Sequence, residues 1–233
     1  MIIRKKMGLV PRDYQWRAVK AVLSGKDVFV IAETGLGKSL VFQCLPFLMP
    51  RGSLVSVISP LNSIMQGQLE TSTSLKFQSR RIGKNDALGT DILHGKVSML
   101  FFGPELLQRQ DFRRVLASDV YTEHLRVVVI DEADCISWVT FRDAWSIDKL
   151  AQVRAFTQAP VLVMTATMPH YMLGQFQNGL NMQRAHIERP PPTTRRLYIE
   201  VSERPDDLMA MLQPIVDDLR ANAAGGENTH LLQ

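Results

Sequence analysis

The chain has 233 residues, 45% of them hydrophobic and 21% charged, so it can bury the core of one full domain and part of another. Its 27 basic and 23 acidic residues leave a formal net charge of +4, which is compatible with a polyanionic partner but does not demonstrate one. The two cysteines, Cys44 and Cys135, are too few for a disulfide framework, and we expect neither a secretory signal nor a membrane span. These features predict an intracellular protein.

Short, wholly apolar runs recur along the chain and predict strands that are buried on both faces of a parallel sheet. Predicted helices lie between them, notably at residues 13–23, 39–48 and 143–156. This alternation of strand and helix predicts an α/β fold. The five predicted strands are Val28–Ile31, Leu54–Ile58, Val97–Phe102, Leu125–Ile130 and Val161–Met164.

A polar segment follows each predicted strand at the point where the strand ends. Ligands of open α/β sheets bind at the carboxyl ends of the strands, so we expect five functional loops along one edge of the sheet. The segments are Glu33–Ser39, Ser59–Ser63, Gly103–Glu105, Asp131–Asp134 and Thr165–Thr167.

The first of these segments predicts a phosphate-binding loop, because a Gly-Lys-Ser sequence stands between a buried strand and a helix. Gly35 and Gly37 allow backbone N–H groups to turn toward a β-phosphate, Lys38 reaches the β- and γ-phosphate oxygens, and the Ser39 hydroxyl can hold Mg²⁺. The plainer alternative is a glycine-rich turn without a ligand. The whole predicted nucleotide-binding segment is Ala32, Glu33, Thr34, Gly35, Leu36, Gly37, Lys38 and Ser39, with Ala32 where the general pattern has glycine.

The fourth segment supplies a pair of carboxylates, Asp131 and Glu132, at the end of an apolar strand. We expect it to approach the phosphate loop from a neighbouring strand, so that Asp131 binds Mg²⁺ through water. Glu132 is then the candidate base that deprotonates the attacking water. Together with Lys38, these two residues form the predicted catalytic set. A helix cap with acidic first-turn residues is the alternative explanation for the pair.

These segments, with Thr165-Ala166-Thr167, resemble the first motor lobe of superfamily-two helicases. Three further segments, Ser59-Pro60-Leu61, Pro104-Glu105-Leu106-Leu107 and Cys135-Ile136-Ser137, are similar to those of RecQ DNA helicases in particular. The similarity covers roughly residues 8–216. It implies a RecA-like P-loop NTPase fold, a three-layer sandwich with a mostly parallel central sheet. It also implies ATP and Mg²⁺ as cofactors and ATP-dependent DNA unwinding in repair or recombination.

By the same resemblance, Arg12 and Gln15 match the element that contacts adenine, with Gln15 pairing with the hydrogen-bonding edge of the base. RecQ proteins usually carry an aromatic residue where this chain has Gly8. An exposed helical residue is the alternative interpretation of Gln15.

Trp138, Phe141 and Arg142 match in position the aromatic-rich loop of RecQ proteins, which couples single-strand binding to hydrolysis. Aromatic and guanidinium groups suit stacking on unpaired bases. The histidine of the family's loop is missing here, and packing in the core is the alternative for the aromatic residues.

The remaining candidates concern nucleic acid. Thr165 and Thr167 match the family motif that couples the bound nucleotide to the affinity for DNA. The alternative is that they cap a helix. Ser63 and Gln68 lie in the segment expected to touch the DNA backbone, or else they are exposed polar residues of a helix. The basic run 76–84 is predicted to be a solvated loop.

The run Arg189-Pro190-Pro191-Pro192 predicts a stiff linker. We expect a RecA-like lobe over residues 1–188, a linker over 189–196, and over 197–233 the incomplete beginning of a second RecA-like lobe. Predicted partners are single-stranded or forked DNA and the missing second motor lobe, without which unwinding is expected to be weak or absent. Two other functions stay open, a DEAD-box RNA helicase lobe and a non-catalytic module that binds nucleic acid or protein.

Overall fold

The computed structural model describes residues 2–88, 92, 96–135 and 147–191, together with residues 209, 212–214, 216–217 and 220. The chain divides into two compact units, Met1–Pro192 and Thr193–Gln233. In the second unit the described residues are helical.

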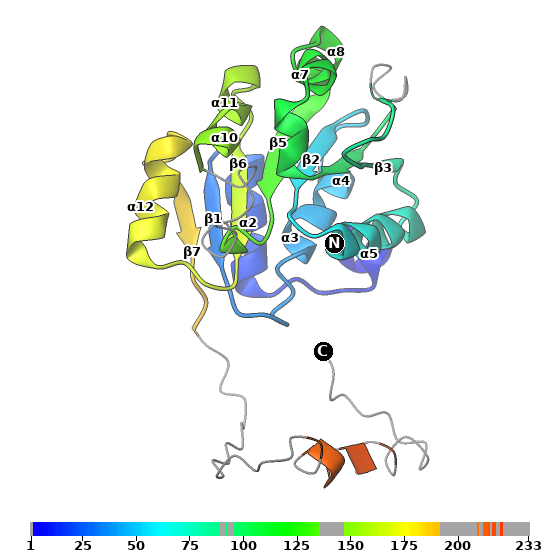
Figure 1. Cartoon of the computed structure of the whole chain (residues 1–233), viewed down its shortest axis with the longest axis vertical. Helices are drawn as coiled ribbons and strands as arrows, with labels where there is room; N and C mark the ends of the chain where they lie inside the picture. The colour runs from blue at the N-terminus through cyan, green and yellow to red at the C-terminus, as the bar shows by residue number, and fades with distance from the viewer. Residues whose placement is uncertain are drawn as a thin grey trace. The chain divides into compact units, whose positions relative to one another are not determined.

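The first unit is built on a seven-stranded sheet in which each described strand pairing is parallel. The strand order is β3-β4-β2-β5-β6-β1-β7 (Figure 1). The strands are β1 (Val28–Ile31), β2 (Leu54–Ile58), β3 (Ser79–Ile82), β4 (Met99–Phe102), β5 (Leu125–Ile130), β6 (Val161–Thr165) and β7 (His186–Glu188).

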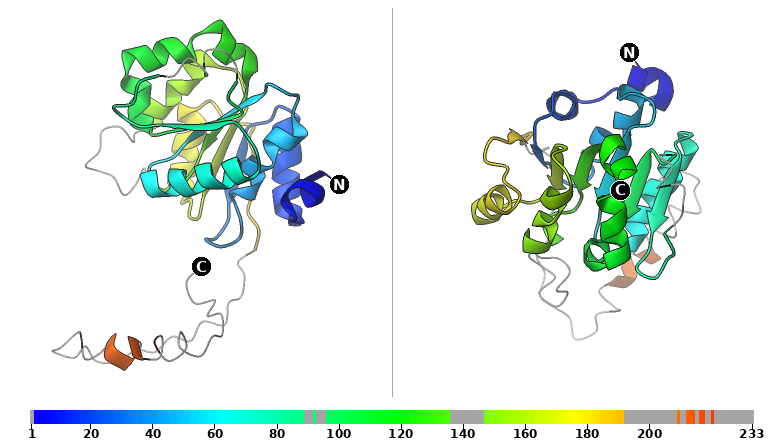
Figure 2. Two further views of the ribbon diagram at one scale, coloured as in Figure 1. Left: turned by 90° about the vertical axis from the view of Figure 1, so that its right-hand side faces the viewer. Right: turned by 90° about the horizontal axis from the view of Figure 1, so that it is seen from above.

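Helices cover both faces of this sheet, so the unit has three layers (Figure 2). One face carries α1 (Ile2–Met7), α2 (Asp13–Leu23), α3 (Leu40–Gln43), α4 (Leu45–Leu48) and α5 (Asn62–Ser74). The other face carries the 3₁₀ helix η1 (Pro104–Gln108), α7 (Gln110–Leu116), α8 (Asp119–His124), α10 (Ile147–Ala151), α11 (Val153–Phe156) and α12 (His170–Gly179). Among the helices that the structure describes, none is long and apolar enough to cross a membrane.

Each central strand feeds two hydrophobic cores, because successive side chains point to opposite faces of a sheet. In β1, Val28 and Val30 pack in the core under α2, whereas Phe29 and Ile31 pack in the core under α12. All four side chains are buried. This double burial is why the predicted strands are apolar without alternation, and the predicted α/β class with a parallel sheet is confirmed.

The predicted helix over residues 39–48 is instead two short helices that meet at Cys44. Pro46 accounts for the break, because it lacks the N–H that would bond to the carbonyl of Phe42. Pro46 instead occupies the first turn of α4. In the predicted helix at 143–156, residues 147–156 contain α10 and α11, and residues 143–146 lie outside the described part.

Two strands were not predicted, and both lie at edges of the sheet. The basic run 76–84, expected to be a loop, contains β3, in which only Ile82 is fully buried. There Arg81 donates to the Asn62 side chain across 3.2 Å. At the other edge β7 is held to α2 by Arg17, which makes paired hydrogen bonds to Glu188. Polar edge strands lack the apolar run that identifies a central strand.

Candidate functional site

Three of the predicted loops meet at the carboxyl end of the sheet, where β6 lies between β1 and β5. The phosphate loop and the acidic pair therefore do not follow neighbouring strands, as the sequence had suggested, but flank the end of β6. Backbone hydrogen bonds join them there. The Ala32 N–H donates to Thr165 O at 3.1 Å, and the Ala133 N–H donates to Met164 O at 3.0 Å.

The loop from Ala32 to Ser39 has the backbone of an anion cradle. Gly35 and Gly37 adopt φ angles of 82° and 81°, a left-handed conformation that costs a residue with a Cβ about 1–2 kcal/mol. Among the described residues, the N–H groups of Gly35, Gly37, Lys38 and Ser39 find no backbone carbonyl to donate to. Consecutive unpaired N–H groups in such a turn suit the binding of phosphate oxygens.

Lys38 is 7% exposed, and its ammonium group donates to the carbonyls of Ala32 at 2.9 Å and Glu33 at 3.5 Å. Burying a charge without partners is costly, so these carbonyls hold the amine inside the loop. The Lys38 charge also favours ionisation of Asp131 and of Glu132, against the stronger opposite effect of burial on each pKa. The Lys38 charge thus acts on both carboxyl groups.

Asp131 is 3% exposed, and burial raises the pKa of its carboxyl above the usual range. Both carboxylate oxygens are held. Oδ2 accepts from the Gln68 amide at 2.7 Å, and Oδ1 accepts from the Glu132 N–H at 3.1 Å. Glu132 is half-buried, and burial followed by the nearby Asp131 charge raises its pKa as well. Its φ of 50° is unusual for glutamate, and such backbone strain is concentrated at functional sites.

These residues fit a magnesium-bound triphosphate. In the part of the chain that the structure describes, no group of three or more His, Cys, Asp or Glu residues could hold a metal alone. Asp131 and the hydroxyl of half-buried Ser39 supply oxygen ligands of the hard type that Mg²⁺ prefers. Since Mg²⁺ binds with few protein ligands, phosphate oxygens and water would complete its shell.

Helix α2 holds the phosphate loop from outside. The Gln15 Nε2 group donates to Gly37 O at 2.7 Å, and its Oε1 accepts from the Arg12 N–H at 2.7 Å. Tyr14 adds a bond from its hydroxyl to Leu36 O at 2.8 Å. Gln15 is therefore buried and not an exposed helical residue. Tyr14 was missed, because nothing in the sequence links it to a carbonyl 22 positions away.

Thr165 and Thr167 connect β6 to the acidic loop. Thr165 is buried, and its hydroxyl donates to Thr167 O at 2.8 Å. The Thr167 hydroxyl donates to Asp134 Oδ2 at 3.0 Å. Hydrogen bonds therefore join the acidic loop to the end of β6.

Two other nucleic-acid candidates, Ser63 and Gln68, lie on α5. Ser63 is exposed on the first turn of α5, whereas Gln68 is buried against Asp131 and not placed as a DNA-backbone contact. The aromatic-rich loop candidates, Trp138, Phe141 and Arg142, lie outside the described residues.

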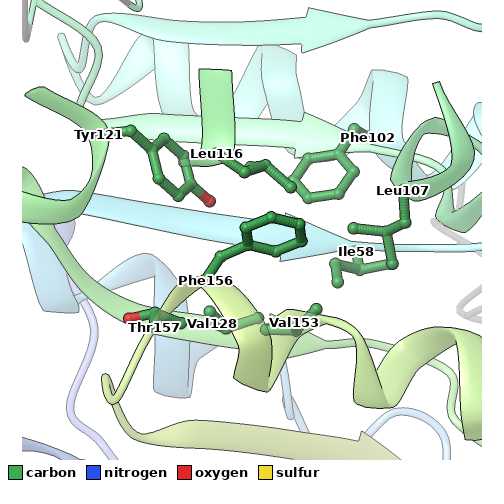
Figure 3. Close-up of a pocket in the computed structure, with 9 residues that line it drawn as sticks. All are labelled: Ile58, Phe102, Leu107, Leu116, Tyr121, Val128, Val153, Phe156 and Thr157. Carbon is green, nitrogen blue, oxygen red and sulfur yellow. The ribbon is translucent and has the colours of Figure 1, made fainter. Parts of the chain in front are cut away.

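An apolar pocket lies between the sheet and the helices of the α8 and α11 face (Figure 3). Tyr121 and Phe156 point into it from opposite sides (Figure 3). None of its lining residues is charged, so it does not contribute to the chemistry above. The lining residues are Ile58, Phe102, Leu107, Leu116, Tyr121, Val128, Val153, Phe156 and Thr157.

Comparison with known proteins gives a consistent result. The family model for DEAD/DEAH box helicases matches residues 12–173. The "ATP-dependent helicase wrn-1" of Caenorhabditis elegans is 29% identical over 92% of this chain and 21% of its own length. The "ATP-dependent DNA helicase RecQ" of Pasteurella multocida is 32% identical over 76% of this chain and 28% of its own length. The expected resemblance to RecQ proteins is thereby confirmed, and the chain spans less than a third of these two relatives.

A comparison with a solved structure supports the fold and nothing further. A hypothetical ATP-dependent RNA helicase from Sulfolobus tokodaii superposes with a TM-score of 0.59 at 18% identity, over 78% of this chain and 54% of that chain.

Proposed function

Because the chain belongs to the DEAD/DEAH box helicase family, we propose that its first unit is the ATP-binding motor lobe of a RecQ-like DNA helicase. The proposal rests mainly on the buried Lys38, whose positive charge favours the ionised form of both Asp131 and Glu132. Folding alone does not require a buried ammonium group beside two carboxylates, since each group is costly to desolvate. A triphosphate with Mg²⁺ supplies the charges that such a site balances.

In this proposal the loop N–H groups of Gly35 and Gly37 bind the β-phosphate, and Lys38 moves from the loop carbonyls to the β- and γ-phosphate oxygens. Ser39 and Asp131 are the residues that would hold Mg²⁺, Asp131 through water. The chemistry that Mg²⁺ supplies when bound is neutralisation of phosphate charge. Gln15 bonds to the loop carbonyl of Gly37 and to the backbone N–H of Arg12, and Arg12 and Gln15 are assigned to the adenine.

Glu132 is proposed as the general base. Burial and the neighbouring Asp131 raise its pKa, which strengthens it as a proton acceptor at neutral pH. Its backbone N–H is bonded to Asp131 Oδ1, which helps to orient the proposed metal-binding carboxylate.

DNA is the proposed substrate, in single-stranded or forked form. The RecQ relative from Pasteurella multocida is named a DNA helicase, whereas the RNA helicase of the structural comparison is only 18% identical and bears on the fold alone. Ser63, Thr165 and Thr167 are proposed to contact DNA or to couple its binding to nucleotide state, and Trp138, Phe141 and Arg142 are proposed to bind unpaired bases.

We assign residues 1–188 to the lobe, 189–196 to a linker and 197–233 to the beginning of a second lobe. In such motors a second lobe contributes an arginine that stabilises charge on the transferred phosphate, an effect of about 10³–10⁵ in rate. The 233-residue chain is therefore expected to bind Mg-ATP, to hydrolyse it slowly and to unwind duplex weakly or not at all. Its site of action is proposed to be the nucleus in a eukaryote and the cytoplasm otherwise.

The experiment that tests this function compares nucleotide binding and ATP hydrolysis by the 233-residue chain and by Lys38→Ala. The wild-type chain should bind ATP, and its slow hydrolysis should rise more with single-stranded DNA than with RNA of matched sequence. Lys38→Ala should lose ATP binding while remaining folded. ATP affinity that survives the substitution would contradict the site, and stronger stimulation by RNA would favour the RNA helicase alternative.

A further inference from the structure

Gln68 reaches the acidic pair from a different element of the fold. It lies on α5, where Met65, Gln68 and Ser72 are the buried residues, at the spacing of one helical face. Its amide Nε2 donates to Asp131 Oδ2 at 2.7 Å, and the bond is buried. Gln68 is thus a polar residue on the buried face of α5, and its side chain bonds to Asp131.

Gln68 makes its bond to Asp131 while one of its own polar atoms lacks a partner among the described residues. In the described part of the structure the Gln68 Oε1 atom is buried and accepts no hydrogen bond. A buried acceptor without a donor is destabilising.

The two bonds to Asp131 together fix its carboxylate plane. Gln68 holds Oδ2 at 2.7 Å and the Glu132 N–H holds Oδ1 at 3.1 Å. A carboxylate anchored at one oxygen can swing about its terminal torsion, which is broad in unrestrained side chains. One anchored at both oxygens keeps its remaining lone pairs in constant directions, which a metal-bound water needs.

We propose that Gln68 is a positioning residue for magnesium, which acts by orienting Asp131 and does not itself contact nucleotide or DNA. This inference rests on the proposed function, since it takes Asp131 to be the carboxylate that serves Mg²⁺. Groups that orient a metal ligand in this way change metal affinity by about 10–100-fold when they are removed.

The test uses the 233-residue chain with Gln68→Leu, and Gln66→Leu as the matched control. Gln66 lies on the same helix, is exposed, and bonds only to Glu70 among the described residues. Binding of a fluorescent, non-hydrolysable ATP analogue is measured across a magnesium titration and again in EDTA. Circular dichroism confirms that each variant is folded, and Gln68→Met, also lacking the donor, replaces Gln68→Leu should the latter not fold.

Gln68→Leu should raise the half-saturating magnesium concentration by about 10–100-fold and leave the affinity in EDTA unchanged, while Gln66→Leu matches the wild-type chain in both. A wild-type magnesium dependence in Gln68→Leu would overturn the inference while the proposed function stands. Equal losses with magnesium and in EDTA would also overturn it, because they indicate a general structural role. A wild-type chain that binds no nucleotide would instead refute the proposed function, and the inference with it.

Discussion

Gly37→Ala tests whether the phosphate loop is held in the observed conformation by α2. Gly37 has a φ of +81°, and a Cβ at this position would lie 2.9 Å from Gln15 Nε2. The same Nε2 donates to Gly37 O at 2.7 Å. The new methyl group therefore strains the backbone and also displaces the amide that fastens the loop.

The two effects can be added. A left-handed conformation costs a non-glycine residue about 1–2 kcal/mol, and the lost hydrogen bond costs about 1 kcal/mol, so Gly37→Ala should lower the free energy of unfolding by about 2–3 kcal/mol. Gly25→Ala isolates the first effect, because Gly25 has a φ of +80° and an added Cβ would meet nothing within 4 Å. Gly67→Ala lacks both effects and should stabilise α5 by up to about 1 kcal/mol.

Urea unfolding of the three variants, followed by circular dichroism, gives these differences directly. Binding of a fluorescent ATP analogue, measured in parallel, should be lost in Gly37→Ala and retained in Gly25→Ala and Gly67→Ala. A Gly37→Ala chain as stable as Gly25→Ala would refute the argument, since it would show that Gln15 does not hold the loop.

Three further predictions concern single side chains. Burial raises the pKa of Asp131 above its ordinary value of 3.8, so the wild-type chain loses stability as the pH rises through the folded-state pKa. In EDTA without nucleotide, Asp131→Asn should therefore be more stable than wild type at pH 7, as measured by urea unfolding. This gain in stability should vanish below about pH 3.8. Equal stability of the two chains at pH 7 would contradict burial as the cause of the raised pKa. Glu132→Gln should keep Mg-ATP affinity and lose about 10²–10⁴-fold in hydrolysis rate, whereas unchanged hydrolysis would exclude Glu132 as the base. Tyr121→Phe leaves the buried Ser56 hydroxyl without its 2.8 Å partner, so it should lower the free energy of unfolding in urea by about 1–3 kcal/mol. Adding Ser56→Ala to the same chain should restore part of this loss. No recovery in the double variant would show that the lost hydrogen bond is not the cause of the destabilisation.

The central strands were predictable because burial on both faces leaves a direct mark on the sequence. The predicted bounds of β1, β2 and β5 coincide with the observed ones. The edge strands β3 and β7 left no such mark, since one side of each is free of a partner strand and polar side chains are tolerated there. Pro46 did mark the break between α3 and α4, but the apolar residues around it suggested one continuous helix.

The loop residues of the candidate site were likewise predictable, because phosphate binding restricts the types of residue and their spacing. The long-range hydrogen bonds were not. Gln68 and Asp131 are 63 positions apart, and neither the helix face that Gln68 occupies nor the insertion of β6 between β1 and β5 follows from local pattern. The left-handed backbone of Glu132 was equally hidden, because glutamate carries no preference for it.

The proposed site is tested most directly by a crystal structure of the chain with Mg²⁺ and a non-hydrolysable ATP analogue. The β-phosphate should lie in the loop 32–39, the Lys38 amine should have left Ala32 O for the phosphate oxygens, and Asp131 and Glu132 should face the same ion. A nucleotide bound elsewhere, or Lys38 still bonded to Ala32 O beside an occupied loop, would contradict it.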